Sequence, residues 1–580
     1  MSTTRSRRAS LAAACCAALA ALTLSAAGAT AANAGAAAVP SGSGAGPIVT
    51  TGNGAIRGET AGTVDEFLGI PYAAPPTGNL RWRPPQPPAP WTGVRDATQF
   101  APSCPQPASP FAPPGPFSED CLYLNVYTPA LRHSDEVSRP VLVWIHGGGL
   151  TQDAGRNYDP AKLAADGIVA VTVNYRLGAL GFLAHPALAS RPGGPAGNHG
   201  LMDQQAALRW VRDNIGRFGG DRHNVTIAGE SAGGLSVLAH MVSRGSRGLF
   251  HKAIIESGSF ALNQQPLAAA EAAGEAFAAK AGCPDQTAAC LRRLPVANLV
   301  NTAFVGIPGV ADGKVLTEPI GTALAAERFA RVPVLNGTNH DEEAIFVSIG
   351  LTVSGGTDVP IPDQPVTAGN YRANIAAVLG VTDARAALIA AEYPPAAYPS
   401  PAAAFSALVG DANFACLALQ IDQETSQRVL TYAYEFNDDT APQIFTPPGL
   451  VPPVATHASE LQYLFGLPNA PFPAPLSAPA SRRSRPPCEP PGRTSPPPAT
   501  PRRRPCPGPP STGRAARRCC RSCHPGHRSR PTSPPGTTAR SGPPGNHSRG
   551  HAGTLTRQPE RDGRRGQPRQ DKFRRPSCCR

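Results

Sequence analysis

The chain has few of the features that would place it across a membrane or around a metal ion. After an apolar stretch near its N-terminus, no run of 18 uncharged apolar residues occurs in its 580 residues, so the sequence predicts no membrane span. The 14 cysteines and 13 histidines do not occur at the spacings that are typical of zinc sites, and we expect neither a metal nor another cofactor. No internal repeat is found, which argues against repeat architectures.

Large apolar residues are almost absent after Leu476, where only Leu555 and Phe573 occur among Arg, Pro, Gly, Ser and Cys. Such a segment cannot bury enough apolar surface to fold, so we predict that residues 477–580 form a disordered Arg/Pro-rich tail. This tail holds 24 Lys and Arg against 4 Asp and Glu, whereas the rest of the chain holds 29 against 36. The formal net charge of +13 therefore belongs to the tail, and we expect no nucleic acid to bind the rest of the chain.

Three interpretations of the tail compete. It is a basic tail of the native protein, an arm that binds nucleic acid or another polyanion, or a translation of a GC-rich gene in the wrong reading frame. Reading one base upstream permits apolar residues at helical spacing between residues 480 and 501. We therefore favour the hypothesis that the tail is frame-shifted.

The N-terminus has the pattern of a secretory signal peptide. Arg5, Arg7 and Arg8 precede an Ala- and Leu-rich stretch, and small residues that suit cleavage follow before residue 35. This pattern predicts that residues 1–34 are a signal peptide and that the protein is secreted. The Arg pair leaves both the general and the twin-arginine export routes open.

The most informative segment of the chain is Phe218–Gly234, which reads FGGDRHNVTIAGESAGG. A β-branched run leads into the G-x-S-x-G pattern around Ser231, and a helix-compatible stretch follows. Small residues on both sides of the serine permit a tight turn, which would expose its hydroxyl at the end of a strand. A serine hydroxyl is a weak nucleophile until a base takes its proton, so partner residues are needed.

Partners occur in the chain order that is typical of α/β-hydrolases, which is serine, then acid, then histidine. An HGGG segment, His146–Gly149, closes a buried-strand pattern before the serine. After the serine, Asp341 and Glu342 follow a short strand pattern, and His457 comes later. Strand patterns at 141–145, 168–174, 225–228, 252–256, 332–335 and 430–436 alternate with helical stretches such as 203–218. This alternation predicts a mainly parallel sheet with helices on both faces, and the Ala-rich region 266–409 predicts a helical cover.

Several motifs resemble the type-B carboxylesterases, a family that includes bacterial para-nitrobenzyl-type esterases and cholinesterases. They include FLGIPYAAPP from Phe67, EDCLYLNV from Glu119 and NHGLMDQ from Asn198, in addition to the HGGG and GESAG segments. The resemblance extends to Leu476 and implies an α/β-hydrolase domain over residues 39–476.

The resemblance also implies a role for each site residue. Ser231 would be the nucleophile, His457 the general base, and Glu342 the acid that orients the histidine. Backbone N–H groups of Gly148, Gly149 and Ala232 would form the oxyanion hole.

Alternatives to two of these residues stand nearby. Asp341 and Glu343 flank the proposed acid, and the family usually has glycine where this chain has Glu343. Of the acids, the family pattern favours Glu342, with Asp341 as the alternative. His340 lies on the same loop as the acid and cannot easily also approach the serine, whereas His457 matches the family's H-x-x-E-L pattern.

Four cysteines match disulfides of the family, which implies the pairs Cys104–Cys121 and Cys283–Cys290. The loop that the first pair closes contains no tryptophan. Cholinesterases hold their choline-binding tryptophan in this region, so its absence argues against a choline ester as the substrate.

Together these patterns predict a secreted serine hydrolase that cleaves small carboxylic esters through an acyl-enzyme. The alternative is a catalytically impaired or non-enzymatic secreted binding protein of the same fold. The sequence leaves the oligomeric state and the natural ester unknown.

Overall fold

The computed structural model describes residues 46–472, apart from residues 110–111, 132–137, 190–193, 195, 305–308 and 448. The predicted signal peptide (1–34) and the predicted tail (477–580), including its proposed frame shift, lie outside the described residues. The predicted catalytic domain, 39–476, is described over nearly its whole length.

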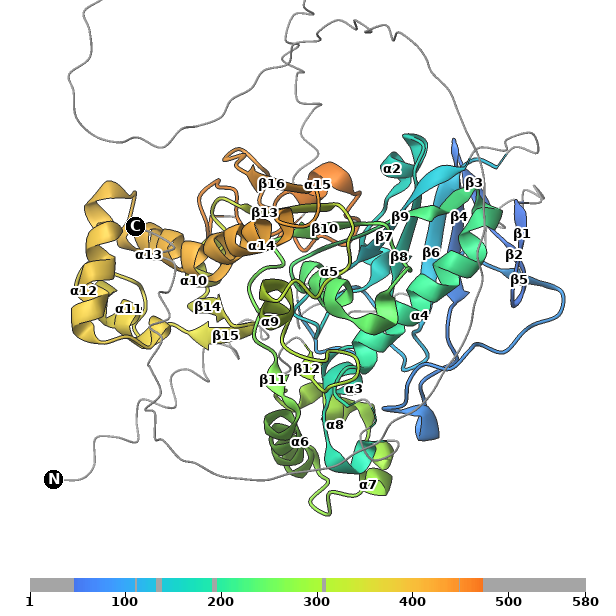
Figure 1. Cartoon of the computed structure of the whole chain (residues 1–580), viewed down its shortest axis with the longest axis horizontal. Coiled ribbons are helices and arrows are strands. Elements are labelled where there is room, and N and C mark those ends of the chain that lie inside the picture. The colour runs from blue at the N-terminus through green and yellow to red at the C-terminus, as the bar shows by residue number, and fades with distance from the viewer. Residues whose placement is uncertain are drawn as a thin grey trace, which may run out of the picture. The chain divides into compact units, whose positions relative to one another are not determined.

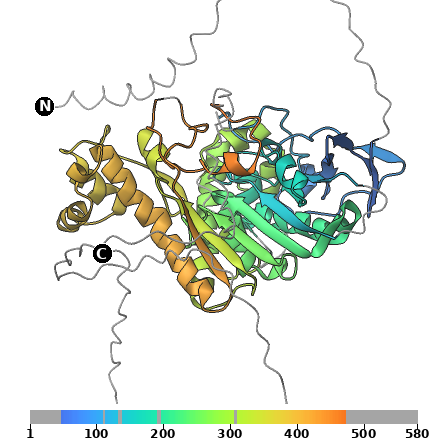
Figure 2. The ribbon, with the colours of Figure 1, turned by 90° about the horizontal axis from the view of Figure 1, so that it is seen from above.

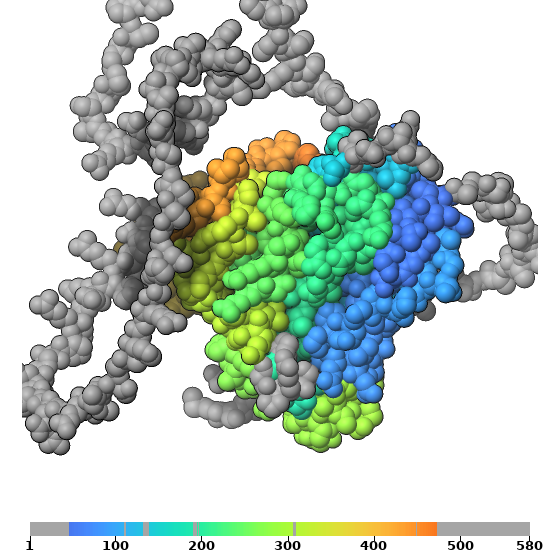
Figure 3. All heavy atoms as spheres, turned by 45° about the vertical axis from the view of Figure 1, so that its right-hand side comes forward, coloured from blue at the N-terminus to red at the C-terminus, as the bar shows by residue number. Residues whose placement is uncertain are grey.

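The centre of the fold is a nine-stranded mixed sheet (Figure 1). In spatial order its strands are β16 (Thr431–Phe436), β13 (Val334–Asn339), β10 (Lys252–Glu256), β9 (Gly220–Glu230), β7 (Arg139–Ile145), β8 (Val169–Val173), β6 (Tyr123–Pro129), β4 (Val64–Pro71) and β3 (Glu59–Ala61). The strands from β16 to β8 are parallel, and β6, β4 and β3 add to them antiparallel. The space-filling view follows this order, with blue N-terminal residues on one side, green in the middle, and yellow and orange on the other side (Figure 3).

Helices cover both faces of the sheet, as predicted (Figure 2). The alternation of side chains along β7 explains this, because Val141, Val143 and Ile145 point into one apolar cluster while Leu142 and Trp144 point into another. The first face is covered by α4 (His199–Asn214), α5 (Ala232–Val242) and α14 (Cys416–Ser426). The second face is covered by α15 (Leu461–Leu464). The predicted α/β-hydrolase fold class is therefore confirmed.

The remaining elements lie outside the large sheet and the helices named above. The helices are α2 (Ala161–Ala165), α3 (Gly178–Phe182), α6 (Leu267–Ala281), α7 (Ala288–Arg293), α8 (Val296–Asn301), α9 (Ile320–Ala325), α10 (Ala344–Ser348), α11 (Tyr371–Leu379), α12 (Asp383–Glu392) and α13 (Pro401–Gly410). A small sheet contains β1 (Ile48–Thr51), β2 (Gly54–Arg57) and β5 (Val94–Asp96). Two strand pairs are β11 (Gln265–Pro266) with β12 (Val310–Ala311), and β14 (Leu351–Ser354) with β15 (Thr357–Pro360).

Several predicted boundaries shift for local reasons. The strand predicted from residue 332 begins at Val334, because Pro333 has no N–H to donate to a neighbouring strand. The helix predicted over 203–218 begins at His199, and its last turn tightens into a 3₁₀ turn that ends at Gly219 with φ of 76°.

The Ala-rich region is helical as predicted, but only part of it reaches the pocket described below. Helices α6 to α8 instead pack around Trp82 in a separate apolar cluster. The parts of region 266–409 that line the pocket are α10 and the β14–β15 hairpin. The sequence patterns did not indicate the hairpin.

Among the described residues, one helical run is long and apolar enough to cross a membrane by length and composition. It spans Pro401–Ser426 and joins α13, a π-helical turn (Asp411–Ala415) and α14. Half of its most apolar window is buried within the protein, where Phe405 and Ile421 belong to core clusters. Charged Asp411 interrupts it, which is why the sequence showed no uncharged run here.

Candidate active site

Ser231 lies on a sharp turn where β9 ends and α5 begins. Its backbone has φ of 56° and ψ of −125°, a conformation that residues with a side chain rarely adopt. The backbone N–H of Ser231 donates to the carbonyl oxygen of Glu256 at 2.8 Å, which ties the turn to β10. The turn is tight because Gly233 has no side chain: a Cβ there would lie 2.0 Å from the carbonyl oxygen of Ile145. The predicted strand, turn and helix are all present.

Two loops bring Glu342 and His457 together although 115 residues separate them. The Nδ1 atom of His457 lies 2.6 Å from Oε2 of Glu342, and both side chains are almost fully buried. Asn339, the last residue of β13, holds this arrangement in place. Its N–H donates to Oε1 of Glu342 at 2.8 Å, and its Nδ2 donates to the carbonyl oxygen of Thr456 at 2.8 Å.

The two alternative residues on the acid loop point elsewhere. His340 is half exposed and its Nδ1 lies 3.1 Å from Oδ2 of Asp341. No hydrogen bond joins either residue to His457 or Ser231 in the described part of the chain. The structure therefore places Glu342, and not Asp341, beside the imidazole.

The other ring nitrogen of His457 faces a second carboxylate. Its Nε2 lies 3.1 Å from Oε1 of Glu230, the residue before Ser231. Among the described residues, no hydrogen bond joins the Ser231 hydroxyl to His457, although both side chains line one pocket. Such bonds are often long in an empty active site and shorten when substrate binds.

The carboxylates around His457 control its charge. Burial alone lowers the pKa of His457, but the negative charges of Glu230 and Glu342 outweigh burial and raise it. Burial raises the pKa of Glu230, and the positive charge of His457 opposes that shift. Burial also raises the pKa values of Glu256 and Glu460, which lie in the same group of carboxyls.

The glycine loop after β7 lies beside Ser231. Gly148 and Gly149 line the same pocket and have φ of 79° and 63°. Neither backbone N–H has an acceptor among the described residues, so both can bind an oxyanion. Ala232, the third predicted donor, is buried at the start of α5, where a helix leaves its first N–H groups without internal partners.

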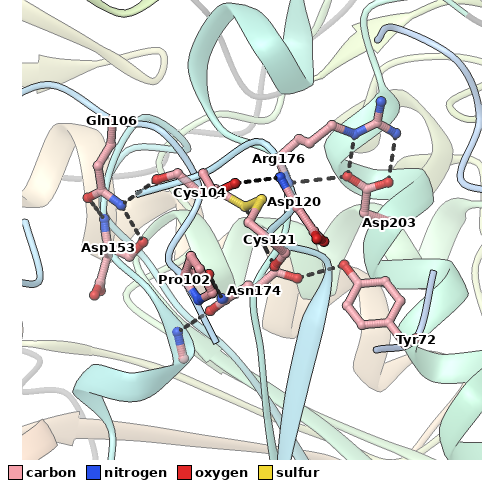
Figure 4. Close-up of a disulfide and its surroundings, with 12 residues drawn as sticks. Tyr72, Pro102, Cys104, Gln106, Asp120, Cys121, Asp153, Asn174, Arg176 and Asp203 are labelled. Carbon is pink, nitrogen blue, oxygen red and sulfur yellow. Dashed lines mark hydrogen bonds and ion pairs between the residues drawn. A yellow bond between two sulfur atoms is a disulfide. The ribbon is translucent and has the colours of Figure 1, made fainter. Parts of the chain in front are cut away.

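The first disulfide loop contacts Asp153, which follows the glycine loop in the chain (Figure 4). Gln106, two residues after Cys104, accepts from the N–H of Asp153 at 2.7 Å and donates to its carbonyl oxygen at 3.1 Å. Asp153 in turn accepts from the hydroxyl of Tyr158 at 2.6 Å, and both line the pocket.

Both predicted disulfides are present, Cys104–Cys121 and Cys283–Cys290. Asp285 lies close to the second pair, but sulfurs that are bonded to each other are not thiolate ligands for a metal.

The pocket has a volume of about 250 Å³ and is largely apolar away from Ser231 and His457. The large apolar residues of its lining are Phe260, Ile345, Phe346, Val353, Phe414, Phe445, Leu461 and Leu467. The rings of Phe346 and Phe414 lie 5.2 and 5.4 Å from the imidazole of His457. No lysine or arginine lines the pocket within the described residues. The site can therefore hold a neutral, apolar ester next to a serine, an imidazole and two free backbone donors.

Two kinds of site residue were missed from the sequence. Glu230 stands inside the G-x-S-x-G pattern, so the pattern itself could have indicated it. Phe414 belongs to the π-helical turn, which has no recognisable sequence signal, and only the structure places it beside His457.

Comparison with known proteins decides the family. The model of the family described as "Carboxylesterase family" matches this chain over residues 45–474. The chain belongs to the carboxylesterase family. It is 38% identical to pyrethroid hydrolase Ces2e of Rattus norvegicus over 461 residues, which cover 73% of this chain and 77% of that protein.

Two further carboxylesterase relatives bear on activity. Acylcarnitine hydrolase of Mus musculus is 37% identical over 457 residues, which cover 73% of this chain and 78% of the relative. Fumonisin B1 esterase of Sphingopyxis macrogoltabida is 41% identical over 307 residues, which cover 51% of this chain and 56% of the relative. As a carboxylesterase, the protein is a carboxylic-ester hydrolase, and the enzyme prediction is confirmed.

The raised pKa of His457 predicts a pH dependence for this carboxylesterase. The sequence predicts His457 as the general base, and a general base must be neutral to accept a proton, so this prediction implies that kcat/KM rises with pH above the ordinary pKa of histidine. Glu230→Gln removes one negative charge that raises this pKa, so the acidic limb of the pH profile should move to lower pH. The profile is measured with a nitrophenyl ester, and Glu435→Gln, on the exposed edge of β16, is the control. An acidic limb that does not move in Glu230→Gln would contradict the interpretation that Glu230 raises the pKa of the base His457.

Proposed function

We propose that the protein is a secreted serine esterase in which Ser231 is the nucleophile, His457 the general base and Glu342 the orienting acid. The observation that supports it most is the position of His457. Its Nδ1 is held by Glu342, and its Nε2 lies 3.1 Å from Oε1 of Glu230 in the pocket that Ser231 also lines. The contact with Glu342 favours the tautomer that carries its proton on Nδ1 and leaves Nε2 as the base.

The proposed reaction has two halves. The Ser231 oxygen forms a bond to the ester carbonyl carbon while Nε2 of His457 accepts its proton. Gly148, Gly149 and Ala232 donate to the oxyanion, and the loss of one such donor typically slows catalysis about 100- to 1,000-fold. The carbon–oxygen bond to the alcohol breaks and the alcohol takes the proton from His457. Water then attacks the acyl group on Ser231 through the same base and releases the acid.

The pocket favours neutral or apolar substrates. Its lining is rich in aromatic and aliphatic side chains, and its acidic residues would repel an anionic ester. The names of the rat and mouse relatives, pyrethroid hydrolase and acylcarnitine hydrolase, are consistent with hydrolysis of esters by this fold. The two disulfides and these mammalian relatives are compatible with a secretory route. The predicted signal peptide, residues 1–34, would direct the chain into that route.

A serine-directed fluorophosphonate tests the proposal. The full chain is expressed in a host that exports it, and the probe is added to the culture medium. We expect labelled protein in the medium, with the label on Ser231 by mass spectrometry, and no label in Ser231→Ala. Ser348→Ala, which changes a serine on α10 near the pocket, should label like the parent chain. A label that persists in Ser231→Ala would overturn the assignment of the nucleophile, and protein that stays inside the cell would overturn secretion.

A further inference from the structure

Glu343, the residue directly after the proposed acid, carries a second buried carboxylate. Its side chain is fully buried. The Oε1 atom accepts three hydrogen bonds, from Oγ1 of Thr352 at 3.0 Å, from the N–H of Val353 at 3.1 Å and from Nδ2 of Asn413 at 3.0 Å. A carboxylate that is removed from water is costly unless donors compensate it, and here one oxygen has three donors.

These donors come from two segments that are distant in the sequence. Thr352 and Val353 belong to β14, and Asn413 belongs to the π-helical turn. Asn413 Nδ2 also lies within hydrogen-bond distance of Thr352 Oγ1, at 3.2 Å, so the two segments touch beside the carboxylate. Glu343 itself begins α10, because its carbonyl oxygen accepts from the N–H of Val347 at 2.9 Å. One side chain therefore joins three elements.

The same three elements form one wall of the ester pocket. Phe346 lies on α10, Val353 on β14 and Phe414 on the π-helical turn, and all three line the pocket. Val353 is itself a donor to Glu343, and Phe414 directly follows the donor Asn413. Because Phe346 and Phe414 also pack against His457, a movement of this wall would change both the pocket and the surroundings of the base.

We propose that Glu343 is a positioning residue that fixes this wall, and that it thereby sets which acyl and alcohol groups the pocket accepts. The proposal rests on the proposed ester-hydrolase function of the pocket. Without the carboxylate, three buried donors would lose their acceptor, and the hairpin and the π-helical turn would separate or rearrange to satisfy them. π-Helical turns within α-helices are frequent at functional sites, which fits a wall that needs this support.

The remaining carboxylate oxygen makes the effect of a conservative change predictable. Among the described residues Oε2 of Glu343 has no hydrogen-bond partner, and burial raises the pKa of the carboxyl to about 7. A glutamine can offer its amide oxygen to the same three donors, whereas an alanine cannot. Glu343→Gln should therefore keep the wall in place, and Glu343→Ala should release it.

Asp312 offers a matched control away from the pocket. It is a buried carboxylate whose Oδ1 accepts from the N–H groups of Lys314, Val315 and Leu316 at 2.9, 2.8 and 3.1 Å. Its other oxygen, like Oε2 of Glu343, has no partner in the described part of the chain. Asp312→Ala should lower thermal stability without changing the pocket wall.

The experiment compares kcat/KM for nitrophenyl hexanoate and nitrophenyl acetate in the parent and the three variants. For Glu343→Ala we expect the ratio of the two values to change by about tenfold, the scale at which hydrophobic pockets discriminate between chain lengths. Glu343→Gln and Asp312→Ala should stay within about twofold of the parent ratio. An unchanged ratio in folded Glu343→Ala, or an equal change in Asp312→Ala, would overturn the proposal.

Hydrogen exchange provides a readout that does not depend on ester hydrolysis. Amides in residues 351–360 and 411–415 should exchange faster in Glu343→Ala than in Glu343→Gln or Asp312→Ala. Equal exchange in all three variants would overturn the role of Glu343 in holding the wall. A parent chain that cleaves neither ester would instead overturn the proposed function of the pocket, and the exchange data would still decide what Glu343 holds.

Discussion

Replacing His457 with alanine is expected to lower kcat/KM for nitrophenyl esters by about 10⁴-fold or more, because the serine hydroxyl then has no base to take its proton. The expectation depends on the contact between Nδ1 of His457 and Oε2 of Glu342, which orients the ring toward the pocket. The variant should remain folded, since the lost side chain lies at the pocket surface rather than in the sheet core. Steady-state kinetics with one short-chain ester measures the loss.

His340→Ala is the matched control for this variant. His340 lies on the loop that carries Glu342, but among the described residues its half-exposed ring has a polar contact only with the neighbouring Asp341. Its replacement should leave kcat/KM within about twofold of the parent value, as is usual for exposed positions. Equal losses in the two variants would show that disturbance of the loop, and not removal of a base, explains the effect.

Replacing Glu342 with alanine is expected to lower kcat by about 10⁴-fold, the scale seen when the acid of such a triad is removed. Glu342 both holds Nδ1 of His457 and accepts from the backbone of Asn339, so its loss frees the ring and the loop together. The same kinetic assay measures kcat, and circular dichroism checks that the fold is intact.

Asp341→Ala distinguishes the two acids that the sequence left open. The N–H of Asp341 donates to the carbonyl oxygen of Ala455 at 2.9 Å, and this backbone bond survives the substitution. We therefore expect kcat within about threefold of the parent value. A loss in Asp341→Ala that matched the loss in Glu342→Ala would contradict the assignment of Glu342 as the orienting acid.

The parts of the fold that the sequence predicted are those that local patterns determine. The buried run from Val141 to Ile145 has the length and the β-branched character of a central strand, and it forms β7. The turn around Ser231 was predicted because Gly229 and Gly233 flank the serine, and a Cβ at either position would collide with neighbouring backbone. Disulfide pairing was predicted by family resemblance and is confirmed.

The parts that the sequence did not predict depend on contacts between distant segments. The G-x-S-x-G pattern contains Glu230, but its contact with His457 joins the end of β9 to a loop far later in the chain, which no local pattern predicts. The hairpin β14–β15 and the π-helical turn have little periodicity of their own, and they are held by Glu343 from a third segment. The burial of Glu343 has no local signal either, since glutamates are rarely fully buried unless they are paired.

A crystal structure of the chain after reaction with a small alkyl fluorophosphonate would show directly whether Ser231 and the glycine loop act together. We expect phosphorus bonded to Oγ of Ser231, with one phosphonyl oxygen within hydrogen-bond distance of the N–H groups of Gly148 and Gly149, and with His457 still bound to Glu342. An adduct on another residue, or a phosphonyl oxygen turned away from the glycine loop toward solvent, would contradict this expectation.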